Sequence, residues 1–355
     1  MKINLNKSAT KSLIDLFNTL ELNMSASDIA LQLVDGFENL DLIEAFESIN
    51  THAEYVHLIK ELYAYDESDP FQKTLFTKHL LPAIKQVYLS DYQDNSYYQT
   101  IKSVEFSDGN TALTLKHYRK NQLLIFDDVT CSGDDFKENI SLAYSPVDYP
   151  YLALIQDDKI WMAIIPHEIN TMKDAIEEAH GAVLVLGLGL GYYPFMIASK
   201  DNVKSITIIE NDQNIIDVFT KYILPTFPDQ NKITIIKDDA FSYMKKEHHK
   251  FDFAFFDIYR SSNEDLALYL KAKQNEKYYP HLTINYWLEN SMIAHLRRIV
   301  ITYIQEVYYD YQPEEISPLD KLIDHVAHKL KDVEINSYDE IVTLLQKERL
   351  INLFL

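Results

Sequence analysis

The sequence predicts an α/β fold built on a parallel sheet, and three observations support this prediction. Residues 183–186 form an uninterrupted apolar run, which is typical of a parallel strand that helices cover on both faces. Glycines follow at positions 187, 189 and 191, so three of the seven glycines in this 355-residue chain fall in one turn. Strand-like runs at 204–210 and 251–257 each end in an acidic residue, where open α/β sheets bind ligands.

The turn after the first strand can hold a ligand. Gly187, Gly189 and Gly191 lack a Cβ, so the backbone can turn tightly and a ligand can lie against main-chain N–H groups. Residues 192–200 can form the next helix, whose amino end would face that ligand. A buried strand–helix turn also uses glycine, so the turn alone leaves both roles open.

The order of elements downstream favours the ligand-binding role. Glu210 ends the second strand about 20 residues after the glycines, where nucleotide-binding α/β units place a carboxylate for the ribose hydroxyls. Residues 214–224 have helical spacing, and 232–237 form a third strand. Another helix opens at 238–241, and the fourth strand ends at Asp257. The pattern is therefore strand, glycine turn and helix, repeated with acids at strand ends.

With these motifs, residues 181–262 resemble the cofactor half of class I S-adenosylmethionine-dependent methyltransferases, and most closely their spermidine-synthase-like branch. The branch places a hairpin and a short helix before the first motif, matched here by 151–165 and 167–172. The resemblance implies a Rossmann-like class I methyltransferase sheet with S-adenosyl-L-methionine as cofactor. The residues that it assigns to cofactor binding are Gly187, Leu188, Gly189, Gly191, Glu210, Asn211, Asp239, Ala240, Phe241 and Glu168.

Some of these residues have a structural alternative. Glu210 could be a solvated acid that ends a strand, and Asp239 could cap a helix rather than bind the adenine amino group. Glu168 could favour the positive amino end of a helix that starts at Pro166. Asp212 is predicted to be a helix N-cap.

Asp257 is the candidate catalytic residue, with Tyr259 as a weaker neighbour. In a methyl transfer the protein aligns the acceptor for in-line attack and removes its proton. A carboxylate at the end of the fourth strand could remove that proton or hold a cationic acceptor. The alternative role for Asp257 is a salt bridge to Arg260.

Composition narrows the classes of partner. The formal net charge of −21 disfavours nucleic acid and favours a small or cationic acceptor, or a protein. Cys131 is the single cysteine and His248–His249 has no acidic neighbour at ligand spacing, so no metal site is expected. The sequence shows neither a signal peptide nor a membrane span, which predicts a cytoplasmic protein.

Four regions are predicted: helices over 1–92, a small antiparallel β unit with a connecting helix over 93–172, a Rossmann-like core over 173–262, and helices over 263–355. The clearest hairpin turns at Asp157–Asp158. The spacing of apolar residues predicts one long helix over 284–307, and no strand is evident after the fourth. Homodimerisation through the helical regions is a further expectation.

The leading functional hypothesis is an S-adenosylmethionine-dependent methyltransferase acting on a small or cationic acceptor. The alternative is aminopropyl transfer from the decarboxylated cofactor to a diamine, although Leu190 stands where that branch has an acid. A nicotinamide-dependent oxidoreductase is a third hypothesis. The fourth is a non-catalytic interaction protein, because Val185 replaces an acid common in methyltransferases.

Overall fold

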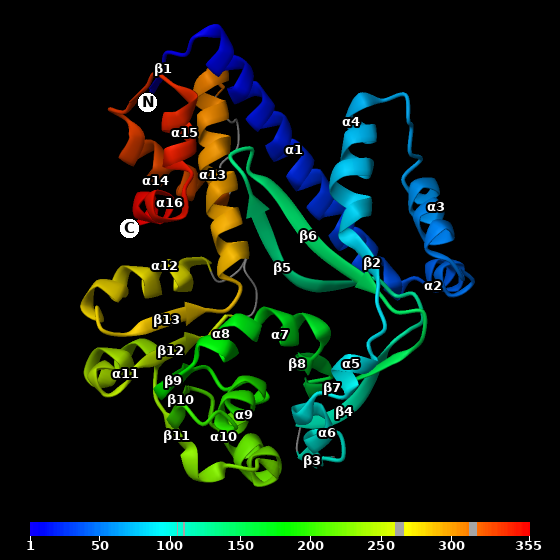
Figure 1. Cartoon of the computed structure of the whole chain (residues 1–355), viewed down its shortest axis with the longest axis vertical. Coiled ribbons are helices and arrows are strands. Elements are labelled where there is room, and N and C mark those ends of the chain that lie inside the picture. The colour runs from blue at the N-terminus through cyan, green and yellow to red at the C-terminus, as the bar shows by residue number, and fades with distance from the viewer. Residues whose placement is uncertain (105, 109–110, 260–265, 312–317) are drawn as a thin grey trace.

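The structure is a computed structural model that describes all of the chain except residues 105, 109–110, 260–265 and 312–317 (Figure 1). Its centre is a parallel sheet in the order β11-β10-β9-β12-β13. The chain runs outward from β9 to β11 and then crosses to β12 on the other side of β9, so the strand order reverses between β9 and β12. The bounds are β9 Gly181–Leu186, β10 Val203–Glu210, β11 Ile233–Lys237, β12 Phe253–Phe256 and β13 Thr283–Tyr286.

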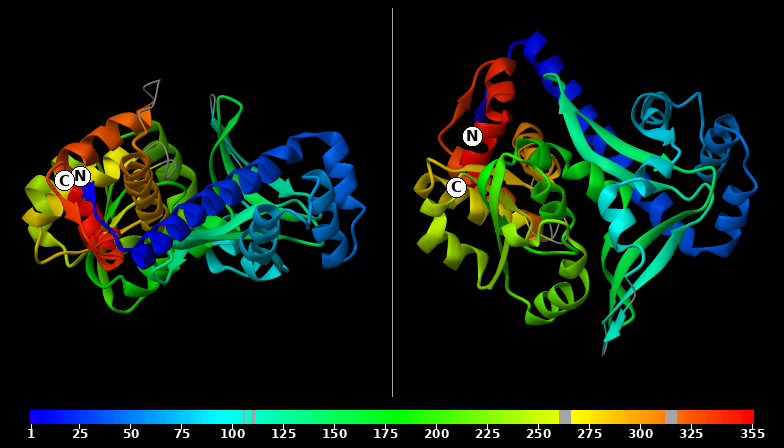
Figure 2. Two further views of the ribbon diagram at one scale, coloured as in Figure 1. Left: turned by 90° about the horizontal axis from the view of Figure 1, so that it is seen from above. Right: turned by 60° about the horizontal axis from the view of Figure 1, so that its bottom comes forward.

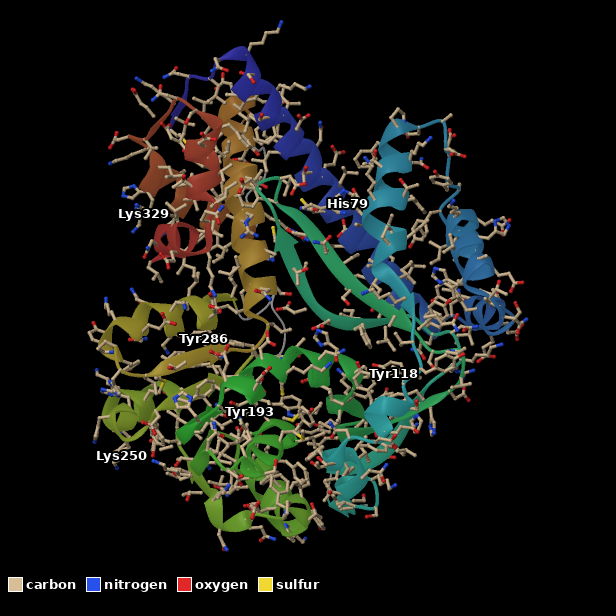
Figure 3. All side chains as sticks on the ribbon, in the orientation of Figure 1. His79, Tyr118, Tyr193, Lys250, Tyr286 and Lys329 are labelled. Atoms are coloured by element: carbon tan, nitrogen blue, oxygen red, sulfur yellow. The ribbon has the colours of Figure 1, made fainter. Side chains whose placement is uncertain are left out.

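This sheet confirms the predicted Rossmann-like α/β fold. The two central strands are almost wholly buried, because β9 and β12 are apolar on both faces. Tyr193, labelled in Figure 3, stacks its ring on Phe255 of β12 at 4.1 Å between ring centroids. The helices that accompany the sheet are α8 Lys173–Glu178, α9 Tyr192–Ala198, α10 Gln213–Val218, α11 Ala240–Glu247 and α12 Leu266–Asn275.

The prediction of one helix over 284–307 is wrong at its start. Residues 283–286 form β13, which pairs in parallel with β12, and the helix α13 spans Glu289–Tyr309. Leu288 separates the two elements with a φ of 54°. A four-residue segment with apolar residues only at Ile284 and Tyr286 fits either a strand or a helix, so the pairing with β12 decides its state.

The amino-terminal region is helical and built around α1, Lys7–Asp35. Leu13, Leu16, Phe17 and Leu20 of α1 belong to the main core with the parallel sheet. The second half of α1 packs instead in a separate core with α2 Leu40–Glu47, α3 His52–Leu62 and the π-helical turn η2 Leu75–Leu80, which follows α4 Pro70–Thr74. Thr51 and Glu54 form the predicted capping box at the start of α3.

Two small sheets connect these helices to the parallel sheet, as the views of Figure 2 show. One is antiparallel and contains β3 Phe106–Asp108, β4 Thr111–Tyr118, β7 Tyr149–Gln156 and β8 Lys159–Ile164. The other is mixed, with β2 Ile84–Gln86 parallel to β6 Lys137–Tyr144 and β5 Leu124–Ser132 antiparallel to it. The predicted turn between β7 and β8 is confirmed, since Asp157 and Asp158 both have positive φ.

Short helices complete the connection: α5 Ser90–Gln93, α6 Ser96–Ile101 and α7 Pro166–Thr171. The carboxyl-terminal region contains α14 Pro318–Leu330, α15 Tyr338–Leu344 and α16 Lys347–Phe354. Both ends of the chain meet there, because β1 Lys2–Ile3 pairs in parallel with β14 Glu334–Ile335 (Figure 1). Within the described residues, every helix is too short or too polar to cross a membrane.

Candidate functional site

A cavity of about 790 Å³ lies at the carboxyl ends of β9, β10 and β12. This is where strand order reverses, the usual ligand position in open α/β sheets. The predicted site residues all line this cavity: Glu168, Gly187, Leu188, Gly189, Gly191, Glu210, Asn211, Asp239, Ala240, Phe241, Asp257 and Tyr259. Their placement around one space is a finding, whereas their individual roles stay predictions.

The three glycines of the turn differ in what their missing side chain allows. A Cβ on Gly187 would lie 1.8 Å from the carbonyl oxygen of Asp257, and one on Gly191 would lie 2.3 Å from the Phe219 ring. A Cβ on Gly189 would meet only Met162 Sδ, at 3.9 Å. Packing within the protein therefore requires Gly187 and Gly191, and Gly189 is the glycine that leaves open space beside the cavity.

Glu210 is not the solvated strand-ending acid of the structural alternative. Its Oε2 accepts the N–H of Leu188 at 3.1 Å, and its Oε1 accepts the N–H groups of Asn211 at 2.7 Å and Asp212 at 2.8 Å. The carboxylate thus holds the glycine turn against the end of β10. A carboxylate has about four acceptor positions, so about one remains for a ligand hydroxyl in this arrangement.

Asp239 caps α11, because its Oδ1 accepts the N–H of Ser242 at 2.9 Å. The residue also lines the cavity, so capping by one oxygen leaves the other for a ligand. Next to it, the Phe241 ring has Lys271 Nζ 3.8 Å from its centroid. Asp212 is confirmed as the N-cap of α10, accepting the N–H of Asn214 at 2.8 Å.

Glu168 and Asp257 bring two carboxyl groups without a partner among the described residues to the same wall. Burial raises the pKa of Glu168 to about 8, and the charge of Asp257 adds to the shift. Burial likewise raises the pKa of Asp257 to about 7, with the charge of Glu210 as the second cause. No hydrogen bond or ion pair joins either side chain to another described residue. The predicted salt bridge to Arg260 lies outside the described residues.

His167 and Tyr259 lie next to this pair in the sequence, one residue before Glu168 and two residues after Asp257. Burial lowers the pKa of His167 to about 4 despite the opposing charge of Asp127, so its imidazole is neutral. Its ring lies 6.3 Å from that of Trp287, at 69°. Tyr259 is buried in the cavity wall two residues after Asp257.

The sequence did not reveal several residues of the wall. Trp287 follows β13 and donates its Nε1–H to Thr171 Oγ1 at 2.8 Å, which connects the sheet to α7. Trp161 and Met162 come from the β7–β8 hairpin. Helical periodicity concealed Trp287, because only the pairing of β13 places it at the end of a strand.

The charge of the wall is one-sided. Six acidic side chains line the described cavity, Glu168, Glu210, Asp212, Asp238, Asp239 and Asp257, against a single basic one, Lys159. Such a cavity favours a cationic ligand over an anionic one.

Comparison with known proteins finds a match for the segment that supplies most of the cavity wall. Residues 167–272 match the family model of the spermine/spermidine synthase domain. The structure is similar to the crystal structure of spermidine synthase from Thermotoga maritima, with 17% identity and a TM-score of 0.29, over 42% of this chain and 56% of that chain. The crystal structure of spermidine synthase in complex with the transition state analogue AdoDATO is similar with 16% identity and a TM-score of 0.28, over 42% of this chain and 55% of that chain. The chain thus spans little more than half the length of these structures, and no curated protein sequence matches it.

The family match corrects the leading functional prediction. It falls on the spermine/spermidine synthase domain, so the predictions of a methyltransferase and of S-adenosylmethionine as its cofactor are wrong. The alternative, aminopropyl transfer, is the hypothesis that the match favours. The strand order and this match establish the coarser statement that the chain has the fold of the S-adenosylmethionine-dependent methyltransferase superfamily.

Proposed function

We propose that this chain transfers an aminopropyl group from decarboxylated S-adenosylmethionine to a small amine. The observation that carries the proposal is the excess of carboxylates around the cavity, six against one basic side chain in its described wall. The family match to residues 167–272 points to the same chemistry.

The charges of the two substrates fit this wall. The decarboxylated donor carries a sulfonium and an ammonium group, and an amine acceptor is cationic near neutral pH. Each would lower the cost of keeping Glu168 and Asp257 ionised. S-adenosylmethionine itself would add a carboxylate, which the acidic wall would repel and for which Lys159 is the single basic side chain of the described wall.

The proposed roles follow the positions of the residues. Glu210 and the turn at Gly189 would hold the ribose, while Asp239, Ala240 and Phe241 would face the adenine. Glu168 and Asp257 would hold the aminopropyl and acceptor nitrogens. Leu190, which stands where the resembling branch has an acid, is buried, and its carbonyl accepts the Tyr97 hydroxyl. Amine binding therefore depends on Glu168 and Asp257.

In the reaction, the acceptor ammonium first gives up a proton, and the lone pair that this frees on nitrogen attacks the propyl carbon that is bonded to sulfur. A C–N bond forms as the C–S bond breaks. The electron pair of the C–S bond stays with sulfur, and the leaving group is neutral methylthioadenosine. The protein must align these atoms and accept the proton released from nitrogen. Asp257, with a pKa of about 7, is suited to accept that proton near neutral pH.

Incubation of the full chain with decarboxylated S-adenosylmethionine and a panel of linear diamines tests the proposal. We expect acceptor-dependent release of methylthioadenosine and an aminopropylated product by mass spectrometry. Asp257→Asn should lower kcat by roughly 100-fold, the usual order for loss of a general base. Asp217→Asn is the matched control, since Asp217 lies on the exposed side of α10, outside the cavity, and activity should persist.

Binding of the donor without product from any amine would overturn the proposal. That result would favour the hypothesis of a non-catalytic protein that retained the fold. Absence of donor binding altogether would remove both.

A further inference from the structure

A second cavity, of about 290 Å³, lies between the segment 78–85 and the strands β5 and β6. Its volume is at the lower end of the range found for small-molecule sites. Three lysines line it, Lys78 from η2, Lys85 from β2 and Lys137 from β6. Figure 3 labels His79, which lines the same cavity.

The three lysines lack acidic partners. No ion pair joins Lys78, Lys85 or Lys137 to another described residue. This is unexpected in a chain with 54 acidic and 33 basic side chains, where a lysine has many carboxylates to meet. Three ammonium groups against two carboxylates leave an excess of positive charge around this cavity within an acidic protein.

Two acids also line the cavity, but both accept hydrogen bonds from the protein. Asp128 accepts the Ser291 hydroxyl and the N–H of Val129, and Asp127 accepts the N–H of Asp128. Thr130 and Ser141 add hydroxyl donors to the wall. The cavity therefore offers more unused donors than acceptors.

His79 adds a buried polar group to this wall. The residue is 8% exposed, and its Nδ1 has no hydrogen-bond partner in the described chain. Burial lowers its pKa, and the charges of Lys137 and Lys78 lower it further, while those of Asp135 and Glu138 oppose them. His79 lies in a π-helical turn, a geometry that often marks functional sites.

We propose that this cavity binds a small anion bearing phosphate or carboxylate groups. Lysine ammonium groups recognise both as point charges, and hydroxyls can donate to either. The site is separate from the acidic cavity at the ends of the parallel strands, so it does not depend on the proposed aminopropyl transfer. Asp127 is near enough to His167 to act on its pKa, which places the anion site close to α7 and the residue next to Glu168.

Isothermal titration of the full chain with inorganic phosphate and, separately, with malonate tests the proposal and distinguishes the two chemistries. The test variant is Lys78→Gln/Lys85→Gln/Lys137→Gln. The control is Lys7→Gln/Lys11→Gln/Lys204→Gln, which changes the net charge equally at residues outside both cavities. Equal thermal melting curves would establish that both variants fold.

We expect saturable binding of at least one anion by the natural chain and by the control, and at least tenfold weaker binding by the test variant. Absence of saturable binding of both anions at millimolar concentrations would overturn the proposal. Equal binding by the test variant, or an equal loss in the control, would do so as well, because the cavity lysines would then have no specific role.

Discussion

Glu168 and Asp257 make the stability of the protein depend on pH. Both carboxyls have a raised pKa in the folded chain, about 8 and about 7, because the cavity wall removes them from water. In the unfolded chain such groups titrate near pH 4. Between these values the folded state binds more protons than the unfolded state, so stability falls as pH rises.

Glu168→Gln should therefore stabilise the substrate-free protein at pH 8 and have little effect at pH 4. The shift corresponds to several kcal/mol, but the effective dielectric of a protein site screens the charge, so we expect on the order of 2 kcal/mol. Urea unfolding at both pH values would measure it, with Glu21→Gln on the exposed surface as the control. An equal gain at both pH values would contradict the prediction.

Glu210 is expected to matter for both the turn and the ligand. Glu210→Gln replaces one acceptor oxygen by the NH2 of an amide. This donor would face backbone N–H donors, which should cost about 1–3 kcal/mol of stability. Binding of methylthioadenosine, measured by isothermal titration, should weaken by roughly tenfold or more, as loss of a charged acceptor implies. Unchanged binding would show that Glu210 only holds the turn, whereas Asp217→Asn, outside the cavity, should bind normally.

At the scale of an element, different glycines of the turn serve folding and ligand binding. All three of its glycines line the cavity, but contacts inside the protein require two of them, and only at Gly189 would an added Cβ meet open space. The same short sequence thus closes the junction between β9, β12 and α9 and leaves backbone free beside a ligand. Substitutions at 187 and 189 should consequently fail in different ways.

Gly187→Ala should prevent stable folding, because its Cβ would overlap the Asp257 carbonyl and backbone cannot move cheaply. Gly189→Ala should fold, at a cost of about 1–2 kcal/mol for an alanine with φ near +54°. We expect it to lose affinity for methylthioadenosine in titration, since the new methyl group enters the cavity. Natural affinity in a folded Gly189→Ala protein would exclude this turn as the binding surface.

At the scale of the whole molecule, α1 joins two cores and one buried ion pair connects it to distant segments. Its first half packs with the parallel sheet and its second half with α2, α3 and η2. Arg298 of α13 donates to Ser27 of α1 at 2.8 Å and to both carboxylate oxygens of Glu138 on β6. The Glu138 side chain is 2% exposed, and Arg298 is the cation that pairs with it.

Arg298→Met should destabilise the protein by about 3–5 kcal/mol, because Glu138 would remain buried without a partner. Glu138→Gln combined with Arg298→Met should recover much of that loss. A double-mutant cycle in urea unfolding measures the coupling. Additive effects would show that the two side chains stabilise their elements independently.

Much of the fold and of the candidate site could be predicted from sequence alone. Apolar strands, the glycine turn and the acids at 210 and 257 are local patterns, and parallel strands bring their carboxyl ends to one edge. That is why the predicted residues at the strand ends line one cavity, together with Glu168 and residues 239–241, which the resemblance assigned. Local patterns also gave the capping box at Thr51 and the turn at Asp157–Asp158.

The tertiary structure decided what depends on contacts between distant segments. Pairing with β12 makes 283–286 a strand and brings Trp287 to the cavity, although the same residues have helical spacing. The carbonyl of Asp257, 70 positions further along the chain, is what makes a side chain impossible at Gly187. The periodicity of apolar residues depends only on residues close in the sequence. The strand at 283–286 and the need for glycine at 187 depend on which distant segment packs against them.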